Sequence, residues 1–221
     1  MKIILKAGDS MSYQTKQEEF WAGEFGDQYI NRNQQERILA SSIALFSEIL
    51  KKTSNISSVI EFGANIGVNL DAIKLLLPDA EFAAIEINQT AADYLREKQW
   101  VKVFQESILT CPQTSLYDIV VIRGVLIHIN PDVLDGVYQK LYDFSQKYIL
   151  IAEYYNPSPV AIEYRGHQDR LFKRDFAGDM LDKFPDLKLL DYGFVYRRDP
   201  NFPQDDITWF LLEKNNKKTE A

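Results

Sequence analysis

Short apolar runs alternate along this chain with longer amphipathic stretches. Each apolar run predicts a strand buried on both faces, and each amphipathic stretch predicts a helix with one face in the core. The predicted strands are 57–61, 82–86, 101–104, 116–123, 148–153, 187–196 and 207–213, and the predicted helices are 34–53, 66–77, 89–99 and 133–145. Strands that alternate with helices are typical of an open, mostly parallel α/β sheet.

The first strand ends in a glycine turn with the spacing Glu61-x-Gly63-x-Asn65-x-Gly67. Gly63 and Gly67 carry no Cβ and would let the backbone approach a ligand closely. Asn65 stands at a position of the turn where glycine is commoner in glycine-rich turns of this kind. Asparagine tolerates left-handed backbone better than most residues. The helix that follows would point its terminal N–H groups at a ligand. The turn therefore predicts a binding site at the carboxyl end of this strand.

Two carboxylates decide which ligand fits this turn. A dinucleotide site needs G-x-G-x-x-G, and Glu61 would repel a phosphate but could help to hold an ammonium group. Glu86 ends the second strand, 23 positions after Gly63, where a βαβ unit places an acid for the two ribose hydroxyls. An ammonium group at one end and a ribose at the other describe S-adenosylmethionine better than NAD.

This pattern resembles motifs I and II of the Rossmann-like methyltransferases. The resemblance implies a seven-stranded, mostly parallel sheet with a terminal antiparallel hairpin and helices on both faces. It also implies that the turn at Ser107 flanks adenine and that Arg123 and Gly124 lie beside the transferred methyl group. The cofactor-binding residues expected on this basis are Tyr29, Arg32, Glu61, Gly63, Ala64, Asn65, Gly67, Glu86, Ile87, Ser107, Ile108, Arg123 and Gly124.

Residues 1–33 crowd aromatic, glycine and charged residues together before the first regular element. They predict a lid segment over the cofactor, with Trp21, Phe25 or Tyr29 offering a π-face to a sulfonium and Arg32 pairing a carboxylate. The alternative is a segment that packs its aromatic side chains on the sheet edge. The methyltransferase domain would then span 34–214, followed by a polar tail at 215–221.

The segment after the fifth strand is rich in tyrosine and in cations, which predicts a pocket for an anionic acceptor at the strand's carboxyl end. The alternative is a solvated charged face. The expected substrate contacts are Trp21, Tyr154, Asn156, Tyr164, Arg165, Lys173 and Arg174. The expected catalytic residues are His128, His167 and Tyr155; either histidine could act as the base that a sugar hydroxyl would need.

A narrower resemblance covers nearly the whole chain. Its motifs are FWAGEFGD at 20–27, GVLIHINP at 124–131, EYYNP at 153–157, YRGH at 164–167 and KRDF at 173–176. They are similar to those of the pseudaminic acid biosynthesis-associated methylase family. This resemblance implies a methyltransferase linked to nine-carbon acidic sugars, free or nucleotide-activated, or to related surface glycans.

Bulk properties narrow the remaining choices. A length of 221 residues favours one domain, and a net charge of −7 argues against a general nucleic-acid binder. Cys111 is the single cysteine, so no internal disulfide can form, and a reducing cytoplasm is the expected location. No apolar run is long enough to span a membrane, and no cluster of residues has the spacing of metal ligands. The expected partner is a small-molecule acceptor, with the chain a monomer or a homodimer. The alternatives are a regulatory protein that binds S-adenosylmethionine without turnover, and a methyltransferase for another small carboxylate or natural product.

Overall fold

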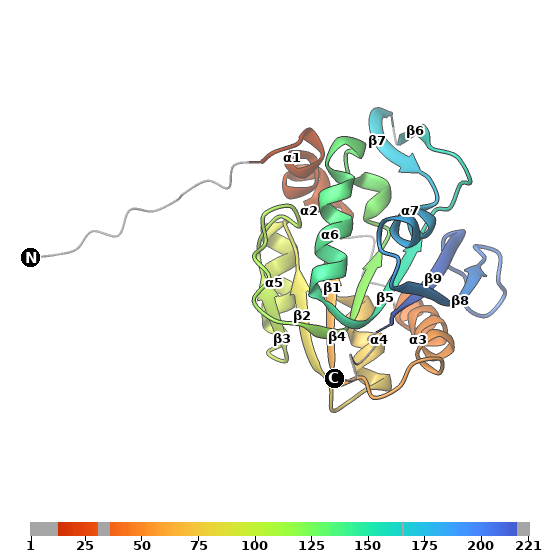
Figure 1. Cartoon of the computed structure of the whole chain (residues 1–221). Helices are drawn as coiled ribbons and strands as arrows, with labels where there is room; N and C mark the ends of the chain where they lie inside the picture. Colours follow the sequence, from red (N-terminus) through yellow and green to blue (C-terminus); the bar gives the residue numbers. More distant parts are fainter. Residues whose placement is uncertain (1–12, 31–35, 165, 216–221) are drawn as a thin grey trace, which may run out of the picture.

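The computed structural model describes residues 13–30, 36–164 and 166–215. Its centre is a seven-stranded sheet in the order β3-β2-β1-β4-β5-β9-β8 (Figure 1). Strands β1 to β5 pair in parallel, whereas β9 runs antiparallel to both of its neighbours, β5 and β8. The predicted sheet with its terminal antiparallel hairpin is therefore confirmed.

The strands of this sheet are β1 Ser58–Phe62, β2 Glu81–Ile85, β3 Val101–Phe104, β4 Tyr117–Arg123, β5 Ser145–Glu153, β8 Leu187–Val195 and β9 Ile207–Lys214. The helices are α1 Lys16–Ala22, α2 Glu24–Ile30, α3 Glu36–Leu50, α4 Val68–Leu76, α5 Gln89–Glu97, α6 Leu134–Phe144 and α7 Phe176–Lys183. Two short 3-10 helices, η1 Leu126–His128 and η2 Pro131–Val133, follow β4.

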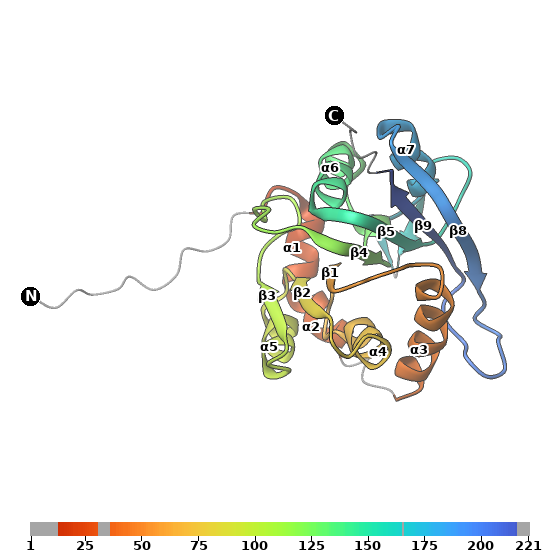
Figure 2. The same ribbon diagram turned by 60° about the horizontal axis from the view of Figure 1, so that its bottom comes forward.

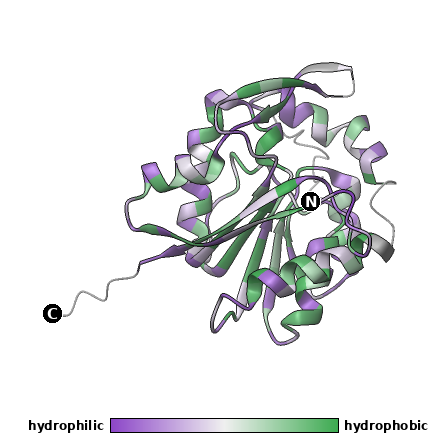
Figure 3. Cartoon of the chain, turned by 90° about the vertical axis from the view of Figure 1, so that its right-hand side faces the viewer, coloured by the Kyte–Doolittle hydropathy of each residue, from purple (hydrophilic) through white to green (hydrophobic). Residues whose placement is uncertain are grey.

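Successive residues of the central strands enter two separate cores. In β4, Val120 and Ile122 pack with α6 and α7, whereas Ile119 and Val121 pack with α3 and α4. Figure 2 shows these two helical layers on opposite faces of the sheet, and Figure 3 shows the apolar character of the strands between them. Burial on both faces explains why these strands are continuous apolar runs in the sequence.

The helix ends follow local chemistry. Gly67, at φ +80°, precedes α4, and the side chain of Asn88 accepts a hydrogen bond from the backbone N–H of Ala91 at the start of α5. Asn130 caps η2 rather than α6, so the predicted helix at 133–145 begins at Leu134, after a 3-10 turn.

The segment after β5 differs most from the prediction. It forms a separate two-stranded hairpin, β6 Val160–Tyr164 and β7 His167–Lys173, and then α7, which the sequence did not predict. Asp175 accepts a hydrogen bond from the N–H of Gly178 and so caps α7. The polar run in the sequence is therefore regular structure.

The helices α1 and α2, the described part of the predicted lid, lie across the carboxyl ends of the strands. Asn88, just after β2, donates from its amide to the carbonyl oxygen of Trp21 (3.4 Å) and to Asp27 Oδ1 (3.0 Å). On the hairpin side, Gln17 Nε2 donates to the carbonyl oxygen of Asp169 at 3.0 Å. These contacts place the N-terminal helices over the region where the predicted ligand site lies.

None of the described helices is both long enough and apolar enough to cross a membrane.

Candidate functional site

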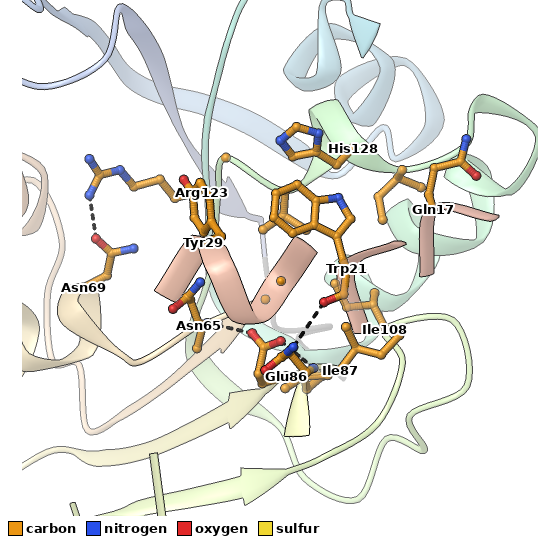
Figure 4. A pocket seen from close by; sticks show the side chains of 18 of the residues that line it. Gln17, Trp21, Tyr29, Asn65, Asn69, Glu86, Ile87, Ile108, Arg123 and His128 are labelled. Carbon is orange, nitrogen blue, oxygen red and sulfur yellow. Dashed lines mark hydrogen bonds between the residues drawn. The ribbon is translucent and has the colours of Figure 1, made fainter. Parts of the chain in front are cut away.

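A cavity of about 510 Å³ opens at the carboxyl ends of the parallel strands, beneath α1 and α2 (Figure 4). Its walls come from the loops after β1, β2, β3 and β4, from the two N-terminal helices and from the β8–β9 loop. The predicted residues among its lining are Trp21, Tyr29, Gly63, Ala64, Asn65, Glu86, Ile87, Ser107, Ile108, Arg123, Gly124 and His128. The cavity has the size and position expected for a small-molecule site in an α/β sheet.

The glycine turn after β1 has the backbone geometry that its spacing predicts. Gly63 is at φ +72° and Asn65 at φ +49°, both left-handed. A Cβ on Gly63 would lie 2.6 Å from Cγ2 of Val125, so this glycine also allows the β4 loop to approach closely. Gly67 does not line the cavity: a Cβ there would lie 2.6 Å from Cδ2 of Leu95 in α5, which makes close helix packing its main role.

Glu86 joins two loops at the cavity wall. Its carboxylate accepts hydrogen bonds from the backbone N–H groups of Asn65 (2.7 Å) and Asn88 (2.8 Å). The side chain is 7 % exposed, and burial raises its pKa above the usual range despite these bonds. The labelled sticks of Figure 4 show Glu86 beside Asn65 and Ile87 in the lower part of the pocket.

Glu61 lies behind the cavity wall. Its Oε1 accepts a hydrogen bond from Asn69 Nδ2 at 2.6 Å, and Asn69 Oδ1 in turn accepts one from Arg123 (2.5 Å; Figure 4). Asn69 and Arg123 line the cavity, whereas Glu61 is buried and does not. Glu61 therefore stands one hydrogen bond behind the cavity wall, and its contact with a ligand stays a prediction.

Glu61 should make the stability of the protein depend on pH. Burial raises its pKa from 4.5 to about 8, so between these values folding takes up a proton and the free energy of unfolding falls as pH rises. Glu61→Gln keeps an acceptor for Asn69 and removes this titration. Urea unfolding should therefore show the variant gaining stability over the wild type as pH rises from about 5 to about 8. Parallel pH profiles for the two proteins would contradict the prediction.

Ser107, predicted beside adenine, is held by a residue of α1. Its hydroxyl donates a short hydrogen bond to Oε1 of Glu18 and accepts one from the backbone N–H of Leu109. The other oxygen of Glu18 accepts from the backbone N–H of Thr15 in a capping box. Glu18 lines the cavity and was not predicted, because Thr15-x-x-Glu18 signals a helix start and not a ligand contact.

An aromatic cluster forms the upper wall. The ring of Trp21 lies 4.6 Å from the His128 ring and 5.4 Å from the Tyr29 ring, and the Tyr164 ring lies 5.0 Å from His128 on the hairpin side. His128 Nδ1 lies 2.6 Å from the carbonyl oxygen of Arg170. A carbonyl accepts only, so Nδ1 carries the proton and Nε2 keeps its lone pair. Burial lowers the pKa of His128 to about 4, which keeps the ring neutral at pH 7.

Among the described residues, the other side chains predicted for catalysis or substrate binding do not line this cavity. Lys173 lies over the Tyr154 ring at 5.0 Å, and Arg174 Nε lies 2.7 Å from Asp179 Oδ2. Tyr155, 42 % exposed, packs near the ring of Phe210. The side-chain amide of Asn156 donates to the carbonyl oxygen of Ser158. Tyr164 does not line the cavity itself, but its ring contacts the ring of His128, which does. Arg32, Arg165 and the side chain of His167 lie outside the described residues, and the roles of all these residues stay predictions.

The β8–β9 loop supplies a wall that the sequence did not predict. Gln204 accepts a hydrogen bond from Arg123 Nη2 and donates one to the carbonyl oxygen of Ser41 (2.8 Å). Asp205 lines the cavity and hydrogen-bonds to the Tyr154 side chain. The charged residues that line the cavity within the described part are Glu18, Glu86, Glu106, Arg123, Arg197 and Asp205. Nothing in the loop sequence marks it as part of a site, because the cavity contacts of Gln204 and Asp205 are with residues distant in the sequence.

The described residues contain no group of three or more His, Cys, Asp or Glu side chains that could hold a metal ion.

Comparison of the sequence with protein-family models and with curated proteins finds no match. Solved structures do match. The plantazolicin methyltransferase BpumL, solved with a desmethyl analogue and SAH, superposes with a TM-score of 0.63 at 13% identity, over 90% of this chain and 94% of that one. The magnesium protoporphyrin IX methyltransferase of Synechocystis, solved with SAM, superposes with a TM-score of 0.63 at 11% identity, over 92% of this chain and 100% of that one. The 1,6-didemethyltoxoflavin-N1-methyltransferase of Burkholderia thailandensis, solved with S-adenosylhomocysteine, superposes with a TM-score of 0.66 at 11% identity, over 90% of this chain and 87% of that one. This chain therefore has the fold of the S-adenosylmethionine-dependent methyltransferases.

Proposed function

We propose that this protein is an S-adenosylmethionine-dependent methyltransferase that acts on a small molecule. The observation that carries the proposal is the position of Glu86, which lines a cavity at the carboxyl end of β2 directly beside the glycine turn. The structural neighbours named above support it, because each was solved with this cofactor or its demethylated product. The alternative of a regulatory protein that binds the cofactor without turnover predicts binding but no methyl transfer.

The lining residues fit the cofactor from one end to the other. Glu86 would accept hydrogen bonds from the ribose hydroxyls, and Ser107 and Ile108 would flank the adenine. Arg123, supported by Asn69, would face the methionine carboxylate. A Cβ on Gly124, at φ +65°, would meet no atom within 4 Å, so the backbone there leaves open space for a ligand.

When bound, the cofactor supplies a methyl group on an activated sulfonium, and alignment of donor and acceptor provides much of the catalysis. The aromatic wall would exclude water from this region, with the Trp21 and Tyr29 rings available to contact the sulfonium. His128 Nε2 would accept a hydrogen bond from an acceptor hydroxyl and so orient it. With a pKa of about 4 it is a weak base, so its main contribution would be orientation.

For the acceptor we propose an acidic sugar or a nucleotide-activated sugar. Arg197 lines the cavity. Two cations of β7 lie on aromatic rings outside the lining: the guanidinium of Arg170 lies 5.2 Å from the Phe20 ring, which is in edge contact with Trp21, and Lys173 lies over the ring of Tyr154. These cations would favour an anion at the hairpin side. Acids outnumber cations in the lining itself, so the acceptor panel must include neutral sugars as well as acidic ones.

The experiment begins with calorimetry of the protein with S-adenosylhomocysteine and, separately, with NAD. We expect binding of the first and none of the second. Methyl transfer from radiolabelled S-adenosylmethionine is then measured on matched acidic and neutral sugars. Binding without transfer to any acceptor would favour the regulatory alternative, and equal transfer to neutral sugars would refute the anionic acceptor.

Glu18→Gln tests whether α1 belongs to the cofactor site. Glutamine preserves the capping box, because its carbonyl oxygen can still accept from Thr15, but it replaces the carboxylate that holds Ser107. The loss of one charge-assisted hydrogen bond should lower the affinity for S-adenosylhomocysteine about tenfold in calorimetry.

The matched control is Glu19→Gln, because Glu19 is the exposed neighbour in the same helical turn. If the two variants bound S-adenosylhomocysteine with equal affinity, the prediction that α1 contributes to the cofactor site would be wrong.

A further inference from the structure

The last residue of β5 is a buried carboxylate that holds the loop of a neighbouring strand. Glu153 is 2 % exposed, and its Oε1 accepts hydrogen bonds from the backbone N–H groups of Val125 and Leu126, each at 2.9 Å. These N–H groups belong to the loop that leaves β4, the strand paired in parallel with β5. They stand at the start of η1, where a helix has N–H groups without a partner inside the helix. Glu153 therefore acts as a cap supplied from another strand.

The capped segment forms one wall of the cavity. Gly124, Val125 and His128 all line it, and the N–H of His128 donates to the carbonyl oxygen of Val125 at 2.9 Å. Val125 also occupies the space next to Gly63, so the β1 turn and the β4 loop pack against each other. A shift of Val125 would consequently move both the backbone at Gly124 and the ring of His128.

We propose that Glu153 is a positioning residue for methyl transfer: by accepting the N–H groups of Val125 and Leu126, it sets the place of Gly124 and His128 in the cavity. Glu153 does not line the cavity, so it acts through the β4 loop. The consequence for catalysis rests on the function proposed above, whereas the consequence for the loop does not.

The geometry indicates that Glu153 acts on the β4 loop as a hydrogen-bond acceptor. Both bonds go to Oε1, while Oε2 is buried without a hydrogen-bond partner among the described residues. Burial raises the pKa of Glu153 to about 7, so a neutral form is already accessible near neutral pH. Glutamine offers the same acceptor oxygen in the same shape, whereas methionine fills the space and offers none.

The test compares the wild type with Glu153→Gln and Glu153→Met by hydrogen-exchange mass spectrometry, without ligand. We expect Glu153→Met to lose protection in peptides that cover 124–129 by about tenfold or more, while peptides of α5 stay as protected as in the wild type. Glu153→Gln should retain the protection of the loop. If Glu153→Met destabilised the whole molecule, the α5 peptides would lose protection too. A local effect leaves the α5 peptides protected and is absent from Glu153→Gln.

Activity is measured on the same three proteins. With an acceptor from the panel above, Glu153→Met should lower kcat about tenfold to a hundredfold, because misplacement of reacting groups is costly. This loss should exceed the accompanying rise in the Kd for S-adenosylhomocysteine. Full protection of the loop in Glu153→Met, or an equal loss in Glu153→Gln, would overturn the proposal. If the wild type binds no S-adenosylhomocysteine, the proposed function fails, and the exchange data still decide whether Glu153 positions the loop.

Discussion

Replacing Glu86 with alanine is expected to lower the affinity for S-adenosylhomocysteine about a hundredfold, because two ribose hydroxyls lose their hydrogen-bond acceptor. The same change leaves the backbone N–H groups of Asn65 and Asn88 without their acceptor, so the loops that frame the ribose would also loosen. The measurement is calorimetry well below the unfolding temperature of the variant, which is determined separately.

The matched control for this variant is Glu81→Ala. Glu81 begins the same strand that Glu86 follows, but it is exposed and lies at the far end from the cavity. It should bind S-adenosylhomocysteine as the wild type does. If Glu86→Ala bound within about threefold of the control, the ribose assignment would be wrong, and with it the strongest support for the cofactor.

Gly63→Ala is expected to lower the free energy of unfolding by about 1–3 kcal/mol, because a residue with a Cβ is strained in the left-handed region. The structure adds a second cost, since the new Cβ would lie 2.6 Å from Cγ2 of Val125. Either the turn or the β4 loop must then move, and both line the cavity. Binding of S-adenosylhomocysteine should therefore weaken along with stability. Urea unfolding and calorimetry measure the two effects.

The comparison variant is Gly136→Ala, in the first turn of α6. A Cβ there would meet no atom within 4 Å, and alanine should raise the free energy of unfolding by about 0.5–1 kcal/mol, because glycine is a poor helix former. Opposite signs for two chemically identical substitutions would isolate the effect of backbone conformation. A Gly63→Ala variant as stable as the wild type would show that the turn does not need its left-handed glycine.

The sheet could be predicted because parallel strands record their burial directly in the sequence. The run at 116–123 is almost purely apolar, and in the structure β4 is buried on both faces. The hairpin β6–β7 could not be predicted in this way, because four of the five residues of β6 are exposed and its three apolar residues do not alternate with polar ones. Its polar and aromatic residues indicated a ligand pocket, but the structure pairs Arg174 with Asp179 and stacks Lys173 on Tyr154.

The geometry on the β1–β2 side of the cavity was predictable for a similar reason. Gly63, Asn65 and Glu86 belong to one βαβ unit, whose connections are short enough for spacing to define geometry. Glu18, Gln204 and Glu153 escaped prediction, since their partners lie far away in the sequence. No local pattern records such contacts, and a glutamate that caps a helix looks the same whether or not it also binds another loop.

The sequence by itself therefore determined the α/β fold, the left-handed turn after β1 and the acid that follows β2. Each of these depends on hydrophobic periodicity or on backbone conformation, which neighbouring residues control. The tertiary structure alone decided that α1 and the β8–β9 loop close the cavity, that Glu61 stands behind Asn69, and that Lys173 and Arg174 lie outside the cavity. The physical reason is that these features depend on which distant side chains meet once the sheet has formed.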